Sequence, residues 1–164
     1  MNIVLVEPEI APNVGNVARL CAATQAVLHL IEPFGFQLDD ARLRRAGMDY
    51  WDHVTWFRWK TWRDFKEAQA SDARLWFVES KGPKHYAEVS YAPDDYLVFG
   101  RESAGLPKSW IEGNQAFWVR IPMFNASSRS LNLSNCAALV LFEALRQQGF
   151  CGEITGFAEG ICLP

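Results

Sequence analysis

Residues 121–137 read IPMFNASSRSLNLSNCA and lead from an apolar run, through a polar loop, into the start of a helix. Beyond the loop, small and apolar side chains recur every three or four residues. This spacing predicts a helix over residues 133–148 that stops at Gly149. Asn132 or Ser130 could cap the start of this helix. The unpaired backbone N–H groups there would also suit an electronegative ligand, but the local pattern favours capping alone.

The rest of the chain alternates short strands with helices. Runs of β-branched and aromatic residues predict strands over residues 3–6, 27–31, 54–57, 75–78, 96–99 and 117–121. Helical spacing recurs over residues 14–25, 62–70 and 108–112. This order is typical of an α/β fold, with a mainly parallel sheet that carries helices on both faces.

Size and composition favour a single globular domain over residues 1–164, because 49% of the residues are hydrophobic and 21% are charged. The chain shows neither a signal segment nor an apolar run approaching the ~20 residues that cross a bilayer, so we expect a cytoplasmic protein. Four scattered cysteines without a close pair give no reason to expect a metal site. A net charge of −3 means that any RNA binding must use local basic patches.

Loops that follow the predicted strands are the most informative part of the chain, because open parallel sheets bind ligands beyond the carboxyl ends of their strands. Three of these loops, residues 7–13, 100–107 and 122–131, are rich in glycine, proline or small polar residues. The sequence contains neither GxGxxG after the first strand nor GxxxxGK[ST] anywhere. The usual dinucleotide-binding and P-loop interpretations therefore lose their main support.

Two further features allow more than one interpretation. Residues 56–63 read WFRWKTWR and could stack RNA bases, although such aromatic side chains more often belong to a core or a subunit interface. His29 alternates with Leu28 and Leu30 in a predicted strand. This pattern predicts a partly buried imidazole with satisfied hydrogen bonds and disfavours a catalytic base.

Three motifs stand in order along the chain. Residues 13–19 read NVGNVAR, residues 99–107 read FGRESAGLP, and the third motif is the segment 121–137. Glycines in the second motif allow the backbone to approach a ligand closely. Together the motifs closely resemble those of the SPOUT RNA 2′-O-methyltransferases. Residues 28–33, 44–51 and 81–82 extend the likeness to the minimal subfamily that methylates the wobble ribose of tRNA.

The resemblance implies a deep trefoil knot, in which the C-terminal segment threads a loop. It also implies S-adenosylmethionine as the methyl donor, bound through backbone groups of the knot loops without a metal. Its implied partners are a tRNA and a second copy of the chain in a homodimer. The implied cofactor-binding residues are Val78, Gly100, Gly105, Ile121, Ser130 and Leu131, and the implied RNA-binding residues are Asn16, Arg19, Arg101 and Arg129.

Transfer of a methyl group to a ribose hydroxyl requires that its proton be removed while oxygen, methyl carbon and sulfur lie in line. The resemblance assigns this task to Arg19, either as the proton acceptor or by orienting a phosphate that polarises the hydroxyl. We favour the orienting role, because an arginine guanidinium stays protonated at neutral pH. The other implied catalytic residues are Glu102, Ser130 and Asn132, which would arrange the hydroxyl, the cofactor and Arg19 through hydrogen bonds.

The expected function is therefore methyl transfer from S-adenosylmethionine to the 2′-hydroxyl of the wobble pyrimidine nucleotide in a tRNA anticodon loop. Alternatives are methylation of another tRNA or rRNA ribose, or a catalytically silent RNA-binding module that kept the fold. A silent module predicts decay of the cofactor loops, yet Gly100, Gly105, Ser130 and Asn132 are all present. A nucleotide-dependent oxidoreductase is disfavoured by the missing GxGxxG.

Overall fold

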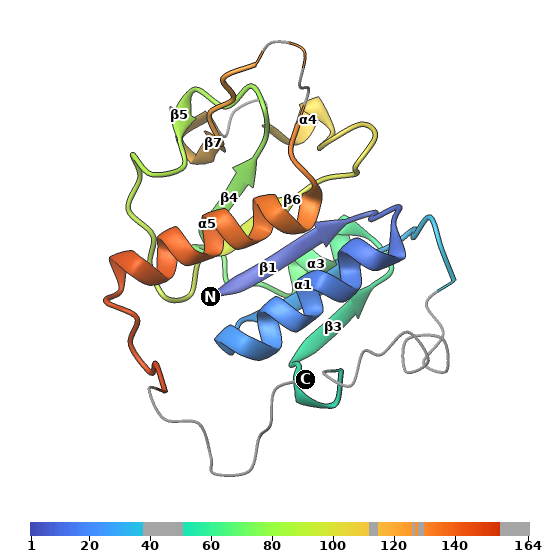
Figure 1. Ribbon diagram of the computed structural model, residues 1–164. Helices are drawn as coiled ribbons and strands as arrows, with labels where there is room; N and C mark the ends of the chain where they lie inside the picture. Colours follow the sequence, from blue (N-terminus) through green and yellow to red (C-terminus); the bar gives the residue numbers. More distant parts are fainter. Residues whose placement is uncertain (38–50, 112–114, 126, 128–129, 155–164) are drawn as a thin grey trace.

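A computed structural model describes residues 1–37, 51–111, 115–125, 127 and 130–154. At its centre lies a seven-stranded sheet in the order β3-β2-β1-β6-β4-β7-β5 (Figure 1). All pairings between these strands are parallel, which confirms the predicted α/β class. The strands are β1 (Asn2–Val6), β2 (Val27–Ile31), β3 (Trp56–Trp59), β4 (Leu75–Val78), β5 (Lys84–His85), β6 (Tyr96–Phe99) and β7 (Trp118–Arg120).

Helices cover both faces of the sheet. Helix α1 (Ala11–Thr24) and helix α5 (Leu133–Gln147) pack against each other on one face, and α5 also contacts β6 (Figure 1). Helix α3 (Trp62–Glu67) lies on the opposite face. The remaining elements are helix α4 (Lys108–Ile111) and two 3-10 helices, η1 (Trp51–His53) and η2 (Gln115–Phe117).

Strand β1 shows why both faces of the sheet are apolar. Ile3 and Leu5 belong to the core beneath α1 and α5, whereas Val4 and Val6 belong to the core that contains Phe65 of α3. None of these five side chains is more than 2% exposed. A parallel strand buried on both faces needs a continuous apolar run, as residues 3–6 provide.

The boundaries of several elements differ from those predicted. Helix α1 begins at Ala11, three residues early, because Pro12 is tolerated in the first turn, where a backbone N–H has no helical partner. Strand β3 starts two residues late, since its pairing with β2 begins at Trp56. Helix α3 ends at Glu67, and β7 keeps only three of the five predicted residues. The two-residue strand β5 was not predicted, because so short a segment carries no periodic pattern.

His29 has the environment that its alternation with leucines predicts. Its side chain is buried, and Nδ1 accepts a hydrogen bond of 3.1 Å from Trp59 Nε1. Burial lowers the pKa of the imidazole to about 4, so His29 is neutral near pH 7. Trp59 and Trp62 pack against Phe65 in the core of the α3 face, which confirms a structural role for these two residues of the aromatic stretch.

Candidate active site

The loops that follow β4, β6 and β7 border a cavity of about 650 Å³ at the carboxyl edge of the sheet. This volume lies within the usual range of small-molecule sites, ~300–1,000 Å³. All six residues predicted to bind the cofactor line the cavity, namely Val78, Gly100, Gly105, Ile121, Ser130 and Leu131. The cavity therefore brings together the second and third sequence motifs.

The loop after β6 owes its shape to two glycines. Arg101 and Gly105 exchange backbone hydrogen bonds of 3.2 and 2.9 Å, which fold the loop into a tight turn. A Cβ atom on Gly100 would overlap the backbone of Gly105 and Leu106. Gly105 has φ +68°, and a Cβ there would overlap the carboxylate of Glu79. Only glycine can adopt this positive φ at position 105 without strain and also avoid the overlap with Glu79.

A chain of hydrogen bonds joins the three motifs. The Glu102 carboxylate accepts from Asn13 Nδ2 at 2.8 Å, and Asn13 Oδ1 accepts from Asn132 Nδ2 at 2.8 Å. Asn132 Oδ1 in turn accepts from the backbone N–H and the hydroxyl of Ser134, at 2.9 and 2.7 Å. Asn13 is only 3% exposed, so this side chain is a buried bridge between the two others. The network ties the starts of α1 and α5 to the loop after β6.

Acidic side chains add further contacts between the loops after β1 and β6. Glu102 also accepts from the backbone N–H groups of Glu9 and Ile10, at 2.8 and 3.3 Å, and so caps the start of α1 from another segment. The Glu9 carboxylate accepts from the N–H and hydroxyl of Ser103, at 2.8 and 2.7 Å. These hydrogen bonds from Ser103 lower the pKa of Glu9. These hydrogen bonds thus hold the loops after β1 and β6 together as one unit.

Residues 1–142 match the SpoU rRNA Methylase family. The chain belongs to this family. A relative from Saccharophagus degradans named tRNA (cytidine(34)-2′-O)-methyltransferase is 52% identical, with 93% of this chain and 98% of the relative covered. The protein of the same name from Escherichia coli strain K12 is 48% identical, with 94% and 98% covered.

A solved structure extends this comparison to three dimensions. It is described as "Structural insights into the 2-OH methylation of C/U34 on tRNA". Its sequence is 40% identical, the TM-score is 0.82, and the alignment covers 91% of this chain and 96% of that one. The similarity to this solved structure thus extends from the sequence to the fold.

The structure does not bring every predicted site residue of this SpoU family member to the cavity. Asn16 and Arg19 are exposed on α1 and do not line it. Arg19 lies six residues beyond Asn13, a rise of ~9 Å along the helix. The predicted catalytic residues Glu102, Ser130 and Asn132 and the predicted RNA contact Arg101 do line it. Arg129 lies outside the described residues.

Asn13 and Glu79 are among the cavity residues that were absent from the predicted set. Asn13 lies within the first motif, and its position before the glycine could have suggested a polar bridge. Glu79 follows β4 directly, lines the cavity and accepts a hydrogen bond of 2.6 Å from Leu106 N–H. In the described parts of the chain, no three His, Cys, Asp or Glu side chains are grouped as metal ligands would be. Within the same residues, no helix combines the length and apolarity that crossing a membrane requires.

Proposed function

We propose that this protein transfers a methyl group from S-adenosylmethionine to the ribose 2′-hydroxyl of the wobble pyrimidine, position 34, in a tRNA anticodon loop in the cytoplasm. The observation that carries the proposal is the cavity, around which Asn13 bridges Glu102 and Asn132 and so unites the three motifs. The names of the relatives at 48–52% identity support the choice of substrate.

The residues of the cavity fit S-adenosylmethionine. Gly100 and Gly105 let the loop after β6 fold tightly against its own backbone and against Glu79, where a Cβ would overlap, and this fold shapes the cavity wall. Backbone groups at Val78, Ile121 and Leu131 would complete the binding site. When bound, the cofactor supplies a methyl group on a positively charged sulfur, a leaving group that needs no metal to activate it.

Side chains of the network would then position the ribose. Glu102 holds Asn13, and Asn13 holds Asn132, so the Asn132 amide has a fixed orientation at the cavity wall. Ser130 lines the same wall and is exposed, so its hydroxyl can contact the ribose or the cofactor. We assign Arg19 to orienting the phosphate next to the target ribose, which lowers the cost of removing the hydroxyl proton. Asn16 and Arg129 would add RNA contacts.

We also propose that the C-terminal segment threads a loop to form the trefoil knot of this family. The support is local. The segment after β7 and the loop after β6 line one cavity, and Asn132 is hydrogen-bonded to Asn13 after β1. Because of these contacts, the segment that leads from β7 to α5 runs against the loops after β1 and β6. Further along the chain, α5 packs on α1.

A homodimer is the assembly that we propose. Leu139 and Phe142 lie one turn apart on α5 and are 41% and 49% exposed. They leave an apolar strip on the outer surface of α5. A second copy packed on this strip would bury it and would bring another α1 near the cavity. Arg19 is exposed on that helix.

We expect Leu139→Glu combined with Phe142→Glu to convert the dimer to a monomer and to lower methyl transfer. Light scattering at micromolar concentration measures the change. Ile154→Glu is the matched control, because Ile154 is 79% exposed but lies beyond α5. A wild-type protein that is monomeric and fully active at the same concentration would contradict the homodimer.

The site of methylation is the direct test of the proposed function. Incubation with total tRNA and labelled S-adenosylmethionine, followed by digestion and mass spectrometry, should place the methyl group on the 2′-oxygen of cytidine or a modified uridine at position 34. A methyl group on a base, in the D-loop or only on rRNA would refute the wobble assignment. The absence of any transfer would favour the silent module.

A further inference from the structure

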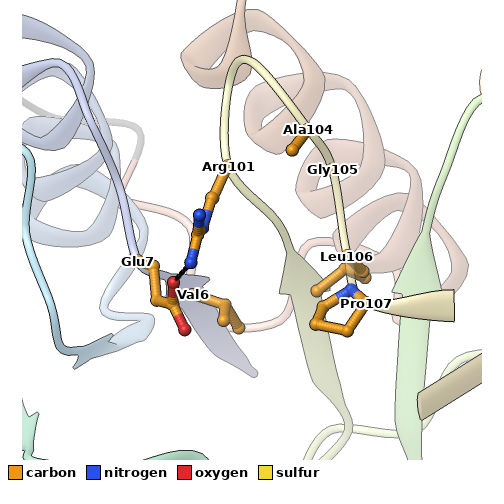
Figure 2. A pocket seen from close by; sticks show the side chains of 7 residues that line it. All are labelled: Val6, Glu7, Arg101, Ala104, Gly105, Leu106 and Pro107. Atoms are coloured by element: carbon orange, nitrogen blue, oxygen red, sulfur yellow. Dashed lines mark hydrogen bonds and ion pairs between the residues drawn. The ribbon is translucent and has the colours of Figure 1, made fainter. Parts of the chain in front are cut away.

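A second, smaller cavity of about 240 Å³ lies at the end of β1, beside the loop after β6. Figure 2 shows its lining, in which Val6, Leu106 and Pro107 form apolar walls. Its charged lining residues are Glu7 and Arg101, which form an ion pair with each other (Figure 2). The site therefore combines apolar surfaces with one acceptor group and one donor group.

This small cavity adjoins the proposed cofactor cavity. Arg101, Ala104 and Gly105 line both, so the two spaces lie along the same loop. A ribose whose 2′-hydroxyl faces the methyl donor would lie where the cavities meet. Its base would then be within reach of the smaller one.

Glu7 has an unusual backbone conformation that aims its side chain. Its φ is +50°, in the left-handed region that residues other than glycine rarely adopt. Its N–H donates to the Ile31 carbonyl at 2.8 Å, which holds the backbone in place. Such strain is tolerated where the surrounding structure enforces it, and it is concentrated at ligand-binding sites.

We propose that the cavity beside the Glu7–Arg101 ion pair binds the base of the target nucleotide and, where that base is cytosine, reads its Watson–Crick edge, an inference that rests on the proposed function. Cytosine presents an amino donor at N4 beside an acceptor at N3, which match a carboxylate and a guanidinium placed side by side. The ion pair need not break, because a carboxylate and a guanidinium each have hydrogen-bonding capacity beyond one contact. Adenine presents the same pattern, so exclusion of purines must come from shape.

The test uses a full-length tRNA with cytidine at position 34 and the same tRNA with pyrimidin-2-one ribonucleoside there, which lacks the 4-amino group. Wild-type kcat/KM should fall roughly tenfold or more when the amino group is removed, as expected for the loss of a hydrogen bond to a charged group. Glu7→Ala should lower kcat/KM on cytidine by a similar factor and should abolish the difference between the two substrates. The affinity for S-adenosylmethionine, measured by calorimetry, should stay unchanged.

We expect Arg101→Ala to lower kcat/KM roughly tenfold or more. Arg146→Ala is its control, because it removes one positive charge from another exposed ion pair, the one with Glu143 on α5. This control variant should change kcat/KM little. If Glu7→Ala slows both substrates equally and preserves their ratio, Glu7 only braces the loops and the inference is overturned. Failure of the wild-type protein to methylate the cytidine tRNA at position 34 would instead refute the proposed function itself, and this inference with it.

Discussion

Gly105→Ala is expected to weaken binding of S-adenosylmethionine by roughly tenfold or more, because loss of the hydrogen bond that Leu106 N–H donates to Glu79 costs ~1–3 kcal/mol and changes the shape of the loop. The added Cβ would overlap the Glu79 carboxylate and displace it from Leu106. The loop would then lose the shape that lines the cavity. Calorimetry with the purified protein measures the effect directly.

Gly149→Ala is the matched control for this variant. Gly149 has φ +66°, almost the same as Gly105, but a Cβ there would meet no atom within 4 Å. The two variants thus share the backbone strain and differ in crowding. We expect Gly149→Ala to bind the cofactor like the wild type. Native affinity in Gly105→Ala would show that the cofactor binds elsewhere.

Arg19→Ala is expected to lower methyl transfer by ~100-fold or more while leaving the affinity for S-adenosylmethionine nearly intact, since a positioned catalytic group contributes at least this much. The separation of the two effects follows from the structure, because Arg19 does not line the cavity proposed for the cofactor. Single-turnover transfer of labelled methyl groups to tRNA measures the first quantity, and calorimetry measures the second.

Two outcomes would contradict the assignment of Arg19. Simultaneous loss of cofactor binding would indicate a structural role in α1, and activity within a few-fold of the wild type would remove Arg19 from the mechanism. Arg146→Ala serves again as the control for the loss of one positive charge at an exposed helical position. If both variants slowed transfer equally, a general effect of charge on RNA binding would explain the result.

Local sequence was sufficient for the class of fold, and the family resemblance pointed to six residues that line the larger cavity. The apolar runs at residues 75–78 and 96–99 are the observed strands β4 and β6, because a strand buried on both faces leaves a continuous hydrophobic signal. Gly100 and Gly105 could be recognised for a similar reason. A backbone that must lie close to other protein atoms or adopt a positive φ restricts the residue type at that position alone.

Only the tertiary structure revealed how the site is held together. Asn13 is separated by 89 residues from Glu102 and by 119 from Asn132, yet its side chain bonds to both. Likewise, Glu7 meets Arg101 because β1 and β6 are neighbours in the sheet, although 94 residues separate them along the chain. Periodicity describes contacts within a helix or strand. The order of the strands decides which loop ends meet, and it depends on packing between distant segments that no local pattern encodes.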